Sequence, residues 1–114
     1  MNIYVDIDET ICQGGSPHDY SLAEPKYDII EKINLLYDLG HTVTYWTARG
    51  GISGIDWRDL TERQLSIWGA KYNFLRMDKP VFDLFIDDKV MTSDKDLPLK
   101  LDYILEKNEY KFAK

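Results

Sequence analysis

Oxygen-bearing side chains follow three separate apolar runs of the sequence. Asp6 and Asp8 come after the first run, and Thr47 comes after the second. The last run ends at the adjacent residues Asp87 and Asp88. Several carboxylates in one cleft need a cation to stay ionised together, and oxygen ligands of this kind suit Mg²⁺. These residue types therefore predict a magnesium-dependent site, provided that the fold brings the three points together.

A lysine in the loop before the last apolar run adds a positive charge to this set. Lys79 precedes Pro80, and its ammonium group could neutralise the charge of an anionic group that is transferred at the site. Lysine side chains are usually solvated, so a plain surface position is the alternative for Lys79. Asp6 and Asp8 also have an ordinary alternative, because aspartate often forms turns at strand ends.

Strand and helix patterns alternate along the chain and would bring these residues to one edge of a sheet. Short apolar runs predict four strands, and apolar residues at helical spacing predict three helices. Alternation of this kind predicts a parallel α/β sheet with right-handed crossovers, in which ligands bind beyond the carboxyl ends of the strands. The predicted strands are 2–7, 41–46, 72–75 and 82–86, and the predicted helices are 26–39, 59–68 and 97–107, with loops over 8–24 and 50–58.

Residues that favour helix ends flank the first two predicted helices. Pro25 suits the start of the first helix, and Gly40 suits its C-terminal cap. Asp59 can cap the start of the second helix, with Glu62 three residues on completing a capping pair. Gly69 is expected to end that helix.

The length and charge of the chain exclude several classes of protein. It has 114 residues, one cysteine and a formal net charge of -6. That length supports one domain, and a single cysteine allows no intrachain disulfide, which fits a reducing, cytoplasmic compartment. We expect no membrane span and no signal peptide, because no run of about 18 apolar residues is present and the N-terminal residues are acidic. The acidic surplus disfavours broad binding of nucleic acid, and the polar residues 108–114 should fray.

The order of these motifs resembles that of the haloacid dehalogenase (HAD) superfamily of phosphatases. The runs YWTARG, WGAKYNFLRMDKP and FIDD are similar to the small capless phosphatases associated with bacterial capsule and surface-polysaccharide synthesis. The resemblance implies one Rossmann-like α/β domain over residues 1–114, with a mostly parallel sheet flanked by helices and no cap domain. It rests on four motifs between residues 3 and 88, which are Asp6-Ile7-Asp8-Glu9-Thr10, Thr47, Lys79 and Asp87-Asp88.

The resemblance also implies roles for the four aspartates. Asp6 would attack phosphorus and form an aspartyl-phosphate, while Asp8 would protonate the leaving oxygen and later deprotonate water. Mg²⁺ would be held by the Asp6 carboxylate, the Asp8 main-chain carbonyl and Asp87. Asp88 would be either a further ligand or a residue that orients the ligands.

The same resemblance implies that three other residues bind the phosphoryl group. Thr47 and a main-chain N–H near Ala48 would bind phosphoryl oxygens. Lys79 would neutralise the charge of the transferring group. Thr10, by contrast, is expected to bond the backbone of its own loop and not to touch substrate.

Four further residues are candidates for substrate binding or for packing. Arg49 directly follows Thr47 and Ala48 and would project near the mouth of the site, and Arg58 lies in the 50–58 loop. Each arginine is a candidate for binding a second anionic group or a sugar, with a surface salt bridge as the alternative. Trp57 would be either a core anchor or a cover over substrate. Cys12 has no basic neighbour in sequence and is expected to pack as a small apolar residue.

The chain departs from the family's pattern at two positions and in one larger feature. Glu9 stands where relatives commonly carry glycine, and Asp78 stands where similar proteins usually have glycine before Lys79. The stretches 9–24 and 48–58 leave room for short loops only, not for a cap domain. The site should therefore be open, so that it could admit a bulky substrate or be covered by a second copy of the chain.

The first hypothesis is a Mg²⁺-dependent phosphomonoesterase acting on a small phosphorylated metabolite, with a sugar phosphate as the leading substrate. The alternative within the same chemistry is a nucleotide or polynucleotide 3′-phosphatase, against which the acidic charge counts. Alternatives of another class are a phospho-acceptor signalling module and a non-catalytic binding module. A receiver-like signalling module has its acidic pair after the first strand and its phosphorylated aspartate later, which is the reverse of the order in this chain.

Overall fold

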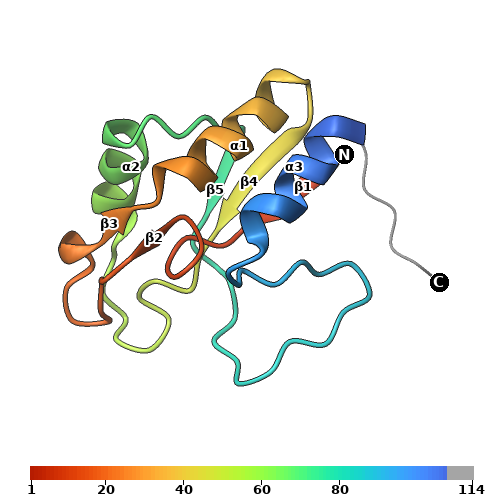
Figure 1. Cartoon of the computed structure of the whole chain (residues 1–114). Helices are drawn as coiled ribbons and strands as arrows, with labels where there is room; N and C mark the ends of the chain where they lie inside the picture. Colours follow the sequence, from red (N-terminus) through yellow and green to blue (C-terminus); the bar gives the residue numbers. More distant parts are fainter. Residues whose placement is uncertain (108–114) are drawn as a thin grey trace.

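Three parallel strands form the sheet at the centre of the protein (Figure 1). The structure is a computed structural model, and it describes residues 1–107. Ile3 lies opposite Val43 in the sheet, and Tyr45 lies opposite Leu75, which confirms the parallel arrangement for these three strands. The order across the sheet is β1 (Asn2–Val5), β4 (Thr42–Trp46), β5 (Phe74–Arg76).

Three α-helices alternate with these strands in the described part of the chain, close to their predicted positions. They are α1 (Tyr27–Asp38), α2 (Arg58–Ile67) and α3 (Leu97–Lys107). Gly40 and Gly69 follow α1 and α2 with φ angles of +95° and +73°, a left-handed conformation that glycine adopts without steric cost. The predicted helix ends at these two glycines are therefore confirmed.

The predicted starts of the first two helices are wrong in detail. Pro25 lies in a short strand before α1, and Lys26 is the residue at the helix N-cap. Asp59 lies inside the first turn of α2, where its charge still favours the helix N-terminus. The Glu62 carboxylate pairs with the Arg58 guanidinium at 2.9 Å, so it does not act in a capping pair.

The helices cover one face of the sheet and form a single core with it. Val43 and Tyr45 of β4 point into this core and are fully buried. Tyr4 and Phe74 point the opposite way, and both are exposed. Alternation of this kind follows from the two-residue repeat of a strand. The core residues that the helices contribute are Ile29, Ile30, Ile33, Leu36, Leu65, Leu97, Leu101 and Ile104.

The connection between β1 and α1, predicted as a plain loop over 8–24, contains a small two-stranded ribbon. Its antiparallel strands are β2 (Cys12–Gln13) and β3 (Glu24–Pro25). A single turn of 3-10 helix, η1 (Tyr20–Leu22), lies between them. The ribbon matters for function because it holds Cys12 and Tyr20 beside the residues that follow β1.

The predicted fourth strand over 82–86 is wrong for this structure. Residues 77–96 run as a long loop away from the sheet before the chain returns to α3 (Figure 1). Leu84 and Ile86 in this loop are 74% and 87% exposed. Among the described strands, β1 pairs with β4 alone, so its other edge has no strand beside it. An apolar run predicts a preference for burial, but it does not supply the neighbouring strand that a ladder of hydrogen bonds requires.

The described residues make one compact unit with one core. No helix within residues 1–107 combines the length and the apolar character needed to cross a membrane. The prediction of a frayed end over 108–114 lies outside the described residues.

Candidate active site

A cavity of about 240 Å³ opens at the carboxyl edge of the sheet. Asp6 and Asp8 reach it from the end of β1, because parallel strands deliver the residues that follow them to the same edge. Residues from the ends of β4 and β5 complete the lining. The full set is Asp6, Asp8, Thr47, Ala48, Arg49, Lys79, Pro80, Val81 and Phe82. The sequence predictions for Asp6, Asp8, Thr47, Ala48 and Lys79 thus converge on one place.

Lys79 connects the ends of all three strands. Its ammonium nitrogen lies 3.3 Å from Oδ1 of Asp6, and its main-chain N–H donates to the Thr47 carbonyl at 3.2 Å. The same nitrogen lies 5.8 Å from the ring centre of Trp46 and 5.5 Å from that of Phe82. Two aromatic faces and a carboxylate hold the ammonium group at the cavity and reduce its freedom to move into solvent.

Thr47 is held from both its main chain and its side chain. Its N–H donates to the Arg76 carbonyl at 2.9 Å, which fixes the residue at the end of β4. Its hydroxyl oxygen accepts from the Arg49 N–H at 3.2 Å. A hydroxyl group has one proton to donate besides the bond that it accepts, and this proton is the group that could meet an anionic oxygen in the cavity.

The Asp8 carboxylate is gripped by Arg49 through both of its oxygens. Nε of Arg49 donates to Oδ2 at 2.9 Å, and Nη2 donates to Oδ1 at 2.8 Å. The Arg49 side chain is 0% exposed, whereas that of Asp8 is 30% exposed. Arg49 therefore lines the cavity, as its predicted place near the site requires, but its guanidinium group turns inward to the acid and does not project from the mouth.

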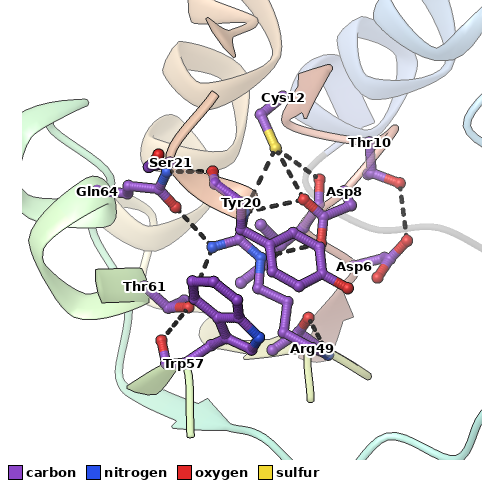
Figure 2. A network of polar contacts seen from close by, with 12 residues as sticks. Asp6, Asp8, Thr10, Cys12, Tyr20, Ser21, Arg49, Trp57, Thr61 and Gln64 are labelled. Atoms are coloured by element: carbon purple, nitrogen blue, oxygen red, sulfur yellow. Dashed lines mark hydrogen bonds and ion pairs between the residues drawn. The ribbon is translucent and has the colours of Figure 1, made fainter. Parts of the chain in front are cut away.

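Residues from α2 and from the β1–α1 connection surround the other side of this guanidinium group (Figure 2). Nη1 of Arg49 donates to the hydroxyl oxygen of Thr61 at 3.1 Å and also to the side-chain oxygen of Gln64. The Tyr20 ring lies 4.7 Å from the guanidinium carbon. Gln64 in turn donates from its side-chain nitrogen to the Tyr20 carbonyl at 2.8 Å. The network joins three separate segments of the chain around one cation.

Tyr20, Thr61 and Gln64 were not found from the sequence, although α2 carries a signal for two of them. Thr61 and Gln64 lie on the same buried stripe of the helix as Leu65 and Trp68. A polar side chain on an apolar stripe needs a buried partner, so this spacing could have indicated an internal polar group. Nothing in the sequence around Tyr20 indicated its contact.

Cys12 lies against the same carboxylate. Its Sγ is 3.5 Å from Oδ1 of Asp8 and 3.5 Å from the Ile7 carbonyl oxygen. Burial, and secondly the negative charge of Asp8, raise the pKa of the Cys12 thiol to about 12. The thiol is therefore protonated and unreactive at neutral pH, in line with the expected packing role.

A tight turn after β1 sets the direction of the two aspartates. The Ile7 carbonyl accepts from the N–H groups of Thr10 and Ile11 at 3.1 Å and 2.9 Å. Glu9 in this turn has a φ of +59°, a left-handed conformation that favours glycine. The Thr10 hydroxyl donates to Oδ2 of Asp6 at 3.4 Å, so the side chain supports that carboxylate, while the bond of Thr10 to the loop comes from its main-chain N–H.

Asp87 and Asp88 do not line the cavity. Both are exposed in the 77–96 loop, and Oδ1 of Asp87 accepts from the N–H of Lys89 at 2.9 Å. Within residues 1–107, no three acids, histidines or cysteines are grouped closely enough to hold a metal ion. The carboxylates are of the right chemical type for Mg²⁺, but their placement in this conformation does not assemble the predicted ligand set.

Arg58 and Trp57 also lie apart from the cavity lining. Arg58 pairs with Glu62 along α2, and its Nη1 lies 3.4 Å from the Leu75 carbonyl oxygen, which fits the predicted alternative of a salt bridge. The Trp57 ring packs edge-on against Tyr20, with 5.2 Å between the ring centres. Trp57 is therefore a packing partner of the Arg49 network and not a cover over the cavity.

Comparison with known proteins supports the fold alone. No protein-family model matches the chain, and no curated protein matches it. A crystal structure of an MCSG target from Vibrio cholerae is similar, with a TM-score of 0.74 and 22% sequence identity. The alignment covers 96% of this chain and 100% of that chain, so the α/β arrangement extends over almost the whole sequence.

Proposed function

We propose that the protein is a phosphomonoesterase of the capless HAD type that requires Mg²⁺ and acts on a small phosphorylated metabolite. The observation that carries the proposal is the cavity in which Asp6 meets Lys79 at 3.3 Å, with Asp8 and Thr47 beside them. A nucleophilic carboxylate, a second carboxylate, a hydroxyl donor and an ammonium group are the parts that phosphoryl transfer needs.

The reaction divides between the two aspartates. An oxygen of Asp6 attacks phosphorus, the bond from phosphorus to the ester oxygen breaks, and a proton from Asp8 passes to that oxygen to release the alcohol. Water then attacks the phosphorus of the aspartyl-phosphate and gives a proton to Asp8. Inorganic phosphate leaves, and the Asp6 carboxylate is restored.

The other lining groups stabilise the charge that spreads over the phosphoryl oxygens. Lys79 is held at the cavity by Asp6 and by two aromatic rings, so its charge is already in place before substrate binds. The Thr47 hydroxyl and the Ala48 N–H are candidate donors to the same oxygens. A cavity of about 240 Å³ suits a phosphoryl group with a small part of its alcohol, while the remainder extends into solvent.

The metal part of the proposal assigns Mg²⁺ to the Asp6 carboxylate, the Asp8 main-chain carbonyl and Asp87, with Asp88 as ligand or neighbour. Bound there, the ion would supply charge neutralisation between nucleophile and phosphoryl group. Because Asp87 lies outside the cavity in this structure, the proposal requires the 77–96 loop to change its conformation.

In that second conformation we place residues 82–86 beside the open edge of β1, as a fourth strand of the sheet. The side chains of this run are exposed in the structure, and no described strand pairs with β1 on the edge away from β4. Pairing would bury apolar surface at about 25 cal/mol per Å² and would satisfy that edge. It would also bring Asp87 to the carboxyl end of the new strand, next to Asp6.

A sugar phosphate is the proposed substrate class, because the cavity is small and open and combines charged and hydroxyl side chains with apolar ones. A second copy of the chain could cover that open side. The free, buried Cys12 fits a reducing cytoplasmic location, since no disulfide is formed.

A phosphate-release screen tests the proposal. The purified chain is incubated with sugar phosphates, nucleotides and 3′-phosphorylated oligonucleotides, with Mg²⁺ or with a chelator. We expect release from small esters only when Mg²⁺ is present, and Asp6→Asn should lower kcat by at least about a thousandfold. Asp102→Asn is the matched control, because this exposed acid pairs with Lys32 on the surface. Release from no ester would overturn the proposal, and release from oligonucleotides alone would replace it with a 3′-phosphatase.

A further inference from the structure

We infer that Arg49 is a positioning residue that fixes the Asp8 carboxylate for proton transfer to the leaving oxygen. The inference rests on the proposed function and deepens it, because it adds a residue that acts through Asp8 and not on substrate. It replaces the sequence-based idea that Arg49 binds a second anionic group.

The geometry between the two side chains is bidentate. Nε and Nη2 of Arg49 each donate to a different oxygen of Asp8, at 2.9 Å and 2.8 Å. Two parallel bonds from a planar guanidinium group define both the position and the plane of the carboxylate, which a single bond cannot do. Each carboxyl oxygen has a second lone pair outside these bonds, so Asp8 can carry the proton that it passes to the leaving oxygen while Arg49 keeps its orientation fixed.

Arg49 is itself prevented from moving. Its third nitrogen, Nη1, donates to Thr61 and Gln64 on α2, and the Tyr20 ring lies 4.7 Å from the guanidinium carbon. The side chain is fully buried, so solvent does not compete for these bonds. Every nitrogen of the guanidinium group therefore has a protein partner, and the rigid helix α2 serves as the support behind Asp8.

The same residue connects Asp8 with the expected phosphate site. The main-chain N–H of Arg49 donates to the hydroxyl oxygen of Thr47 at 3.2 Å, while its side chain holds Asp8. This leaves the Thr47 hydroxyl proton directed away from that bond. One residue thus fixes the relative placement of a phosphoryl-binding group and the proton donor.

Leaving-group dependence separates this role from a structural one. The p-nitrophenolate group of p-nitrophenyl phosphate leaves readily without a proton. The alcohol of an alkyl phosphate, by contrast, depends on proton transfer from Asp8 to leave. Arg49→Lys keeps the positive charge but loses the bidentate grip. We expect its kcat for the alkyl ester to fall at least about tenfold further than its kcat for the aryl ester, with KM changed by less than about threefold.

Two further variants complete the experiment. Gln64→Leu removes a support behind Arg49 and should give the same pattern with a smaller difference between the two esters. If thermal unfolding shows that Arg49→Lys is not folded, the Gln64→Leu result tests the positioning role in its place. Arg63→Lys, at an exposed position on α2, is the matched control and should leave both rates unchanged. Equal losses on the two esters would overturn the positioning role while leaving the phosphatase proposal intact. An inactive wild-type chain would overturn both.

Discussion

Two apolar stretches of this chain differ completely in how far they are buried. In β4, Val43 and Tyr45 are fully buried between two neighbouring strands and beneath the helices. In the loop over 77–96, Leu84 and Ile86 are chemically similar but exposed. The difference lies in pairing, because β4 has β1 and β5 on its sides, whereas residues 82–86 have no strand beside them. Apolar character creates the tendency to form a strand, and an available partner decides whether the strand forms.

Hydrogen exchange measures this contrast most directly and should show its largest effect. We expect amide protons of residues 43–46 to exchange at least about a thousandfold more slowly than those of 83–86, because the former are bonded within the sheet. Adding Mg²⁺ with a phosphate mimic should slow exchange at 83–86 selectively. Strong protection of 83–86 without any addition would show that the fourth strand forms by itself, and would remove the contrast.

Truncating an isoleucine of the core and an isoleucine of the loop should change the free energy of unfolding by amounts that differ by several kcal/mol. Ile30 is buried in the core, so Ile30→Ala should lower the free energy of unfolding by about 2–5 kcal/mol. Ile86→Ala should change it by less than about 0.5 kcal/mol, because the side chain has little packing to lose. Urea unfolding of both variants makes the comparison. A large loss for Ile86→Ala would indicate that the loop is buried in solution.

Removal of one carboxylate from the 77–96 loop tests whether this exposed region supplies a ligand to the metal proposed for the cavity. Asp87→Asn should weaken Mg²⁺ binding by at least about tenfold, measured by calorimetry, because it takes away a proposed ligand. Asp83→Asn, in the same exposed segment, should leave the affinity unchanged. Equal affinities for both variants would separate the loop from the metal site.

Glycine at position 9 should produce the smallest effect. Glu9 has a φ of +59°, which is strained for a residue with a side chain, so Glu9→Gly should raise the free energy of unfolding by less than about 1 kcal/mol. The gain is small because glycine also adds entropy to the unfolded chain. Glu9→Ala should give no gain, since alanine retains the strain. Thermal unfolding of the two variants distinguishes the cases.

The hydrophobic periodicity of the sequence and the order of its strands and helices were enough to predict most of the residues that line the cavity. Asp6, Thr47 and Lys79 each follow an apolar run, and a parallel sheet must bring such positions to one edge. No knowledge of distant packing was needed for that step. The same reasoning placed Asp87 there, and it fails in this structure because the strand before Asp87 is not paired.

The direction of the Arg49 side chain could not be read from local sequence. Its position two residues after Thr47 suggested a place at the mouth, where a cation would meet substrate. Its partners instead come from α2 and from the loop before α1, which are distant in sequence and approach only after the helices pack. Long side chains at a sheet edge can turn either way, and tertiary contacts decide between the two directions.

The ion pair between Asp8 and the fully buried Arg49 constrains how the sequence can vary. Loss of Arg49 alone would leave the Asp8 carboxylate without its partner and with a cavity behind it. Loss of Asp8 alone would leave the buried Arg49 charge without a counter-ion. Either single replacement is costly, whereas a joint exchange for two neutral groups of similar size is tolerable for folding. Because the proposed reaction also needs Asp8, diverged copies that keep the activity should keep both residues, and copies that lose the activity should lose the two together.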